Sequence, residues 1–383
     1  MPGPEVFSEV ASIEYPILDA DAHVNEPPDT WQGRVPAKLR DRAPKVVHTD
    51  NGDVWSFDDG KSMRPVGLTA TAGLSYLQFK PAGITYEGMR PGSFDVKARL
   101  ADMDADGIWL QVLYPSVTLG GAKVYGAEPE LQRACVRAYN EWLAEFCHAS
   151  EGRLVGQGIL PTTGVDDAIE ETKKSLELGH RGVVMSAFPN GSLDPTPEDD
   201  PYWSFVQDAD VPVAVHIGSF VKGAVGQNPP ALDTLAFMGV AGSSKAGAHT
   251  LPVVCDLLFS GIFERFTRLK LLLVEANIGW IPAMLEQGDD MFLRYRWFTE
   301  TSALLPTMPS RVFHRNFWAT FMVDTVGVEL RHRLNVDHLM WSRFRRWRSS
   351  MPTVSIMNVA QKLRWKTRLG IVGKLALVPV NQR

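Results

Sequence analysis

Short apolar runs alternate along this chain with longer segments whose hydrophobic residues recur at helical spacing. This alternation is typical of parallel strands joined by crossover helices. Eight runs have the length and composition of buried strands, and they lie at Ile17–Ala22, Gly107–Tyr114, Leu154–Leu160, Gly182–Ser186, Val211–His216, Leu269–Glu275, Trp318–Val323 and His338–Trp341. Eight such strands predict an α/β fold, the (β/α)8 TIM barrel.

The segments between these runs supply the helical half of the pattern. Pro129–Cys147 carries one apolar stripe, and Asp166–Leu178 and Pro252–Phe263 behave similarly. A long interval after the first strand, about residues 36–93, is rich in glycine, proline and turn-forming pairs. We expect an insertion there that carries a hairpin and lies over the barrel mouth.

Composition favours one catalytic domain, which we place at residues 1–342. The chain has 383 residues, of which 45% are hydrophobic, and this is enough for one large core. A net charge of −5 gives no general reason to expect nucleic acid as a partner. We find no membrane span or signal peptide, and the three cysteines are too scattered for a disulfide framework, so the cytoplasm is the expected compartment.

Candidate metal ligands lie at the carboxyl ends of the predicted strands, which share one mouth in a parallel barrel. Asp21 and His23 close the first strand, and being two residues apart they leave an extended chain on the same side. His216 ends the fifth strand and Glu275 the sixth. Because imidazole and carboxylate suit zinc or manganese, we predict a divalent metal held by Asp21, His23 and His216, with Zn²⁺ expected and Mn²⁺ as the alternative.

The roles of the other polar residues near these strand ends stay open. His216 and Glu275 are the candidates for catalysis, although Glu275 could equally orient a histidine or pair with an arginine. Glu26 is expected to brace the first loop rather than to react. His180 precedes the fourth strand at a helix end, where we expect a structural role.

Three segments share the order and spacing of motifs found in one enzyme family. They are ILDADAHVNEP at the first strand, VPVAVHIGS at the fifth, and LLLVEANIGW at the sixth. In these, and in further segments from about Ile17 to Trp341, the chain resembles the amidohydrolase-related family that includes aminocarboxymuconate-semialdehyde decarboxylase and the resorcylate decarboxylases. Asp21-x-His23 stands where some members have His-x-His or Glu-x-His. Glu275 begins a Glu-x-x-x-Gly-Trp motif where others have His-Gly.

The resemblance implies a metal-dependent hydrolase or carboxy-lyase, commonly a homodimer, acting on a small aromatic or unsaturated carboxylic acid. In the hydrolytic version, a carboxylate takes a proton from water that the metal acidifies. In the decarboxylative version, the metal binds the substrate carboxylate while an active-site acid protonates the carbon that loses CO₂. Both versions need the same ligand cage and a small-molecule partner, with no nucleic acid and no membrane.

The chain departs from the family pattern after the eighth strand. Members place an Asp there that binds the metal and transfers protons, and aligning Trp341 puts Arg343 at that position. Arginine stays protonated and offers no lone pair, so it cannot replace that Asp. From His338 onward there are ten Lys or Arg and no acid. We expect residues 343–383 to be a frameshifted or mis-sequenced terminus or a diverged basic tail, and a catalytically impaired barrel retained for binding is the alternative function.

Overall fold

The computed structural model of the protein describes residues 16–74, 78, 80, 82–220, 246–299 and 301–342. Arg343 and the remainder of the expected tail lie outside the described residues. Within these ranges, no helix combines the length and the hydropathy that crossing a bilayer requires.

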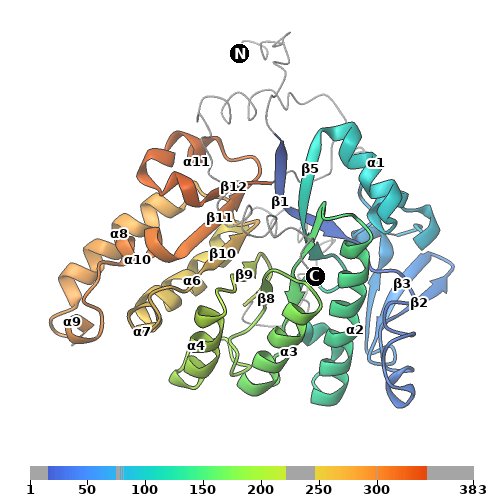
Figure 1. Ribbon diagram of the computed structural model, residues 1–383, viewed down its shortest axis with the longest axis horizontal. Coiled ribbons are helices and arrows are strands. Elements are labelled where there is room, and N and C mark those ends of the chain that lie inside the picture. The colour runs from blue at the N-terminus through green and yellow to red at the C-terminus, as the bar shows by residue number, and fades with distance from the viewer. Residues whose placement is uncertain are drawn as a thin grey trace, which may run out of the picture.

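Parallel strands form the centre of the molecule at all eight predicted places (Figure 1). They are β1 (Ile17–Val24), β5 (Ile108–Pro115), β6 (Leu154–Gly156) with β7 (Gly158–Ile159), β8 (Val183–Met185), β9 (Val213–His216), β10 (Leu271–Val274), β11 (Phe317–Phe321) and β12 (Leu339–Trp341). Two parallel sheets result, with the strand orders β1-β5-β6 and β7-β8-β9-β10-β11-β12. The predicted α/β barrel class is confirmed.

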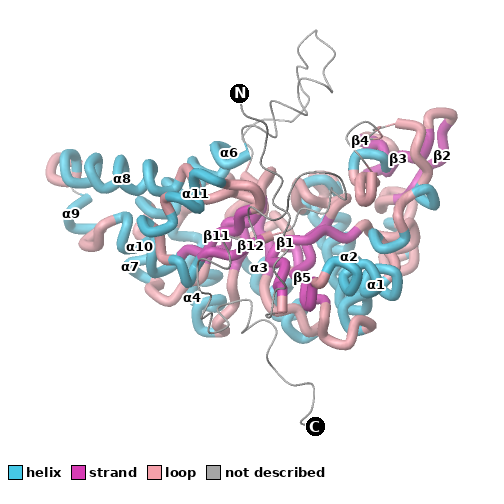
Figure 2. The backbone as a smooth tube through the Cα atoms, turned by 90° about the horizontal axis from the view of Figure 1, so that it is seen from above, coloured by secondary structure: helices cyan, strands magenta, loops and turns pink. Residues whose placement is uncertain are grey.

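The two sheets are joined at two places. At the first, β6 and β7 belong to one predicted strand and are separated only by Gln157, whose N–H donates to the Leu113 carbonyl at 3.1 Å. At the second, the Ser342 hydroxyl, just after β12, donates to the Asp21 carbonyl of β1 at 2.9 Å. The last strand therefore lies beside the first, and Figure 2 shows the two together.

Helices surround the strands, and their ends follow local sequence. They are α1 (Val96–Asp106), α2 (Pro129–His148), α3 (Val165–Glu177), α4 (Asp200–Asp208), α6 (Ala246–Phe259), α7 (Ile262–Arg265), α8 (Ile281–Tyr295), α9 (Thr301–Leu304), α10 (Pro309–Asn316) and α11 (Thr325–Glu329). At the start of α1, the Asp95 carboxylate accepts from the Ala98 N–H, and Gly107 ends the helix in the left-handed conformation.

One predicted helix differs from the expected stretch Pro252–Phe263. The structure has α6 beginning earlier, with Pro252 inside it, and a separate α7 after it. The break falls at Gly261, whose φ of 77° is a left-handed conformation that glycine adopts without strain. Hydrophobic spacing alone predicted one continuous helix across this break, because both helices contribute buried residues to the same core.

The insertion after β1 contains the expected hairpin, extended to a three-stranded antiparallel sheet. Its strands are β2 (Lys45–Thr49), β3 (Gly52–Phe57) and β4 (Ser62–Pro65). Trp55 of β3 packs edge-on against Trp31, with ring centroids 5.4 Å apart, and Arg42 binds Asp58 at 2.7 Å. The sheet lies at the edge of the molecule (Figure 2), rather than directly over the strands as expected from sequence.

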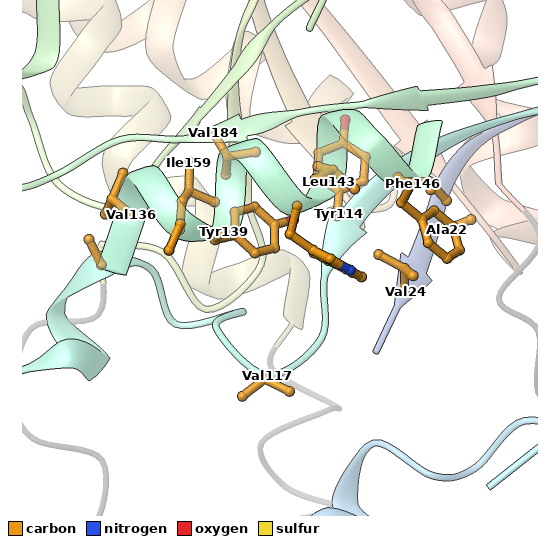
Figure 3. Packing of buried hydrophobic residues seen from close by; sticks show 14 of the residues in the cluster. Ala22, Val24, Tyr114, Val117, Val136, Tyr139, Leu143, Phe146, Ile159 and Val184 are labelled. Atoms are coloured by element: carbon orange, nitrogen blue, oxygen red, sulfur yellow. The ribbon is translucent and has the colours of Figure 1, made fainter. Parts of the chain in front are cut away.

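The core beneath the first strands is built from α2. Figure 3 shows Leu143 and Phe146 of this helix together with Ala22 and Val24 of β1. The other half of the barrel, from β8 to β12, buries a second apolar cluster against α4, α6, α8 and α10. Fully buried leucines such as Leu143 stabilise the fold strongly, since truncating one to alanine costs about 2–5 kcal/mol. These clusters fix the strands whose ends carry the site.

Candidate metal centre

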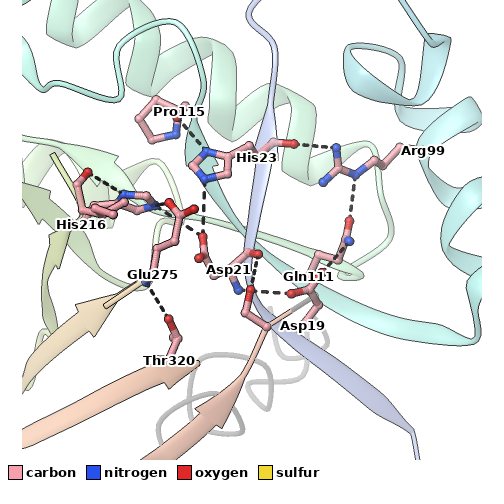
Figure 4. Close-up of polar contacts among 11 residues, drawn as sticks. Asp19, Asp21, His23, Arg99, Gln111, Pro115, His216, Glu275 and Thr320 are labelled. Carbon is pink, nitrogen blue, oxygen red and sulfur yellow. Dashed lines mark hydrogen bonds and ion pairs between the residues drawn. The ribbon is translucent and has the colours of Figure 1, made fainter. Parts of the chain in front are cut away.

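Four side chains converge where β1, β9 and β10 end (Figure 4). Asp21, His23, His216 and Glu275 each offer one ligand atom, and these atoms all lie within 4.8 Å of one another. His23 Nε2 lies 3.6 Å from Asp21 Oδ1, and His216 Nε2 lies 3.5 Å from the same oxygen. Glu275 Oε2 is 3.9 Å from His216 Nε2. The structure thus brings together every site residue that the sequence singled out within the described ranges.

The spacing suits ligands that share one cation. Two ligands about 2.1 Å from a tetrahedral ion lie roughly 3.4 Å apart, close to the separations found here. Both Asp21 carboxylate oxygens and His216 Nε2 are buried, and none has a hydrogen-bond partner among the described residues. Buried polar atoms are almost always satisfied, so this cluster of orphaned atoms fits a divalent cation.

Backbone carbonyls set the orientation of both imidazoles. The carbonyl of Pro115 lies 2.9 Å from His23 Nδ1, and that of Ile217 lies 3.1 Å from His216 Nδ1. Because a carbonyl only accepts, each Nδ1 carries the hydrogen when the ring is neutral. The Nε2 lone pair of each ring then points toward Asp21, as a metal ligand requires.

Burial and charge act together on the protonation of the three ligands. Burial lowers the pKa of His23 to about 4, which keeps this imidazole neutral. Burial alone would raise the pKa of Asp21, but the adjoining His216 and His23 hold it below its usual value. Burial opposes charge on His216 as well, yet Asp21 and Glu275 raise its pKa. The metal-free site therefore favours an ionised Asp21, which is the form that binds a cation.

Comparison with known proteins shows the family and the fold. A family model described as amidohydrolase matches residues 19–343. The chain belongs to the amidohydrolase family. Gamma-resorcylate decarboxylase from Rhodococcus jostii is 28% identical over 290 residues, which cover 67% of this chain and 81% of that protein.

Two solved structures share the fold of this amidohydrolase. The amidohydrolase map2389c from Mycobacterium avium subsp. paratuberculosis has a TM-score of 0.68 at 18% identity, covering 96% of this chain and 100% of that one. A dihydroxybenzoic acid decarboxylase from Polaromonas, solved with manganese and the inhibitor 2-nitroresorcinol, has a TM-score of 0.54 at 19% identity, with 90% and 89% covered. Both confirm the architecture on which the site is built.

A β-bulge in β1 determines which side chains of this amidohydrolase enter the barrel. Asp19 pairs with Gln111 and Ala22 with Leu113, so β1 advances by three residues over a stretch in which β5 advances by two. Asp19 therefore faces Gln111 and the helical layer, whereas His23, also at an odd position, faces the interior beside His216. One extra residue reverses the faces of a strand. Sequence spacing placed Asp21 and His23 together but could not reveal the bulge.

Glu275, directly after β10, has an uncommon backbone conformation that contacts with β11 hold in place. The φ of Glu275 is 59°, in the left-handed region where residues other than glycine are strained. The Thr320 hydroxyl of β11 accepts from the Glu275 N–H at 2.7 Å. Just beyond, Asp324 accepts from the N–H groups of Ile278 and Gly279 at 2.6 and 2.7 Å. These contacts fix the turn that carries Glu275.

Glu26 follows His23 closely along the chain and connects two loops. Its carboxylate is fully buried and accepts from the Val117 N–H at 3.1 Å and the Thr118 hydroxyl at 3.4 Å. Burial raises its pKa to about 7. The bracing role expected from sequence agrees with these contacts, although the loop that Glu26 holds is the one after β5. His180 Nε2 contacts the Asn140 carbonyl at 2.8 Å, which fits a structural role.

Tyr114 is a neighbour of the ligands that sequence analysis did not single out. Its ring centroid lies 5.1 Å from that of His216 and 6.4 Å from that of His23. The hydroxyl is buried and has no hydrogen-bond partner in the described part of the chain. Burial and the charge of Asp21 raise its pKa well above the usual value, so it remains a donor. Its place at the end of the second predicted strand was the available signal.

Proposed function

We propose that this amidohydrolase is a carboxy-lyase that removes CO₂ from a small aromatic or unsaturated carboxylic acid with the help of one divalent metal ion. Asp21, His23 and His216 would hold the ion, and Glu275 would complete the site. The observation that carries the proposal is the convergence of four ligand atoms, among which the Asp21 oxygens and His216 Nε2 are buried and find no hydrogen-bond partner in the described part of the chain. The named activity of the Rhodococcus relative supports decarboxylation over hydrolysis.

Either Mn²⁺ or Zn²⁺ suits the donor set. Two imidazoles and two carboxylates are acceptable ligands for both ions, and the described cluster contains no thiolate that would favour the softer one. Sequence analysis favoured Zn²⁺. The manganese named in the Polaromonas structure is a reason to test Mn²⁺ with equal weight.

The residues of the site would have different roles in decarboxylation. When bound, a divalent ion would neutralise the substrate carboxylate and polarise a neighbouring oxygen. Asp21 stays ionised, and the Pro115 and Ile217 carbonyls hold the Nδ1 side of each ring, which leaves each Nε2 facing the ion site. Loss of CO₂ also needs an acid that delivers a proton to carbon. Glu275, whose Oε2 lies 3.9 Å from His216 Nε2, is the group we assign to that transfer, because His216 would be occupied with the ion.

The test is metal-dependent turnover of a defined panel. The purified chain is stripped with a chelator, reloaded with Mn²⁺ or Zn²⁺, and assayed for CO₂ release from mono- and dihydroxybenzoates. We expect turnover only after reloading and a loss of at least about 100-fold in Asp21→Asn, because one ionised ligand is removed. Asp166→Asn, an exposed carboxylate in the first turn of α3, is the matched control and should keep its activity.

A negative result has a clear meaning. A folded chain that binds neither ion at one equivalent and turns over no member of the panel contradicts the proposal. It would support instead the impaired barrel suggested by Arg343. A homodimer, proposed from the family resemblance, is tested on the same samples by light scattering.

A further inference from the structure

We propose that Arg99 is a positioning residue for the metal centre. From α1 it acts through Gln111 and Asp19 to fix the β1 bulge that turns Asp21 and His23 into the barrel. This inference rests on the proposed metal site and deepens it, because it names what holds two ligands of that site in place.

Arg99 is a buried cation that binds the backbone on which His23 stands. Its side chain is 2% exposed, although it lies on a surface helix. Nη1 donates to the His23 carbonyl at 2.8 Å and to the Gly92 carbonyl at 3.2 Å, and Nε donates to Gln111 Oε1 at 2.8 Å. Burying a guanidinium is costly unless its donors are satisfied. These three bonds therefore hold Arg99 and the His23 backbone in one arrangement.

The contacts continue from Gln111 to the other end of the bulge (Figure 4). Gln111 Nε2 donates to Asp19 Oδ2 at 3.0 Å, and Asp19 Oδ1 accepts from the Asp21 N–H at 3.4 Å. The amide of Gln111 has one orientation that satisfies both neighbours, with oxygen toward Arg99 and nitrogen toward Asp19. Asp19 and Gln111 are almost completely buried, so water cannot easily replace either partner.

The bulge lies between the two attachment points. Asp19 precedes it and the His23 carbonyl follows it, and both are bound to the Arg99 and Gln111 pair. A strand without this restraint can relax toward a regular register, in which odd-numbered residues after Asp19 would share its outward face. Asp21 and His23 would then leave the barrel interior. The cluster of Arg99, Gln111 and Asp19 thus connects α1, which supplies no ligand, to the positions of two candidate ligands on β1.

If the cluster served stability alone, a different result would be expected. Removing its hydrogen bonds would lower the unfolding free energy of the metal-free chain but leave the metal affinity of the folded fraction unchanged. The decisive readout is therefore Mn²⁺ and Zn²⁺ binding to the metal-free protein by titration calorimetry, measured beside circular dichroism as a check of folding. Activity is not needed for this comparison.

Two single variants should weaken binding. We expect Arg99→Met and Gln111→Glu to raise the Kd for the metal at least tenfold, because the first removes the donors and the second sets a carboxylate against Asp19. Arg153→Met is the matched control. The Arg153 side chain also donates to backbone carbonyls of β5, at Ile108 and Trp109, and pairs with Asp104 of α1, but these bonds lie at the start of the strand, opposite the end that faces the site. Its Kd should stay within about twofold of wild type.

A double variant keeps the test valid if Arg99→Met fails to fold. Asp19→Asn combined with Gln111→Glu exchanges the amide and the carboxylate, so the bonds to Arg99, between the two side chains and to the Asp21 N–H can all re-form. We expect it to regain most of the affinity lost in Gln111→Glu. Wild-type affinity in folded Gln111→Glu, or no recovery in the double variant, would overturn the inference. If wild type itself binds neither ion, the proposed metal site fails, and this inference fails with it.

Discussion

At the scale of single residues, burial decides which groups carry charge. Glu26 shows this most clearly, because two hydrogen bonds to its carboxylate do not offset complete burial, and its pKa rises to about 7. Sequence could identify Glu26 as a bracing residue from its place near the first strand end. It could not reveal the partner loop after β5, because that contact joins residues 91 positions apart.

Glu26→Gln should remove a pH dependence of stability. Between the ordinary glutamate pKa of 4.5 and about pH 7, the unfolded chain has lost the proton that the folded chain keeps, so the wild-type free energy of unfolding falls as pH rises. The whole effect is about 3 kcal/mol. The glutamine side chain does not titrate in this range. The free energy of unfolding of the variant, relative to that of wild type, should therefore increase from pH 4.5 to 7.5. Urea unfolding at several pH values measures this, and a constant difference would contradict it.

At the scale of elements, the pattern of hydrophobic residues located each described barrel strand, because parallel barrel strands are buried on both faces, but not the separate strands β2, β3 and β4. The same pattern missed the break at Gly261 and the bulge after Asp19, since each depends on how one residue meets a neighbouring element. Asp19, Asp21 and His23 all occupy alternate positions, yet the structure divides them between two faces. Residue spacing predicted the candidate ligands, and tertiary contacts orient them.

Asp324 connects two elements beside the site. It caps α11 through the Gly327 N–H at 2.8 Å and also holds the turn after β10 at Ile278 and Gly279. Asp324→Ala removes the two oxygens that accept these three hydrogen bonds, so we expect a loss of about 2–4 kcal/mol in the unfolding free energy. Chemical denaturation of the metal-free chain measures it. Asp50→Ala, at an exposed position in the turn between β2 and β3, should change it by less than about 1 kcal/mol, and equal losses in both variants would argue against the assigned role.

At the scale of the whole molecule, the candidate site gathers groups from strands on different sides of the barrel. Ligands from β1, β9 and β10 come together only in the folded chain, so a bound ion should stabilise the native state. At about 100 times its Kd, the ion adds about 2.7 kcal/mol. We expect the thermal midpoint to rise on addition of Mn²⁺ or Zn²⁺ and to return with a chelator. The same midpoint with and without metal would contradict a site of this kind, and Asp21→Asn should show no rise.

The hydroxyl of Ser342 meets the carbonyl of Asp21 across 321 positions of sequence. During synthesis, the strand that carries Asp21 emerges from the ribosome long before the segment that will lie along its open edge. Contacts of such long range form late and slowly. A cation at the proposed site would therefore be bound only after synthesis: the growing polypeptide carries Asp21 and His23 early, but the candidate ligands of β9 and β10 and the strand that lies beside β1 follow only when nearly the whole barrel has been made.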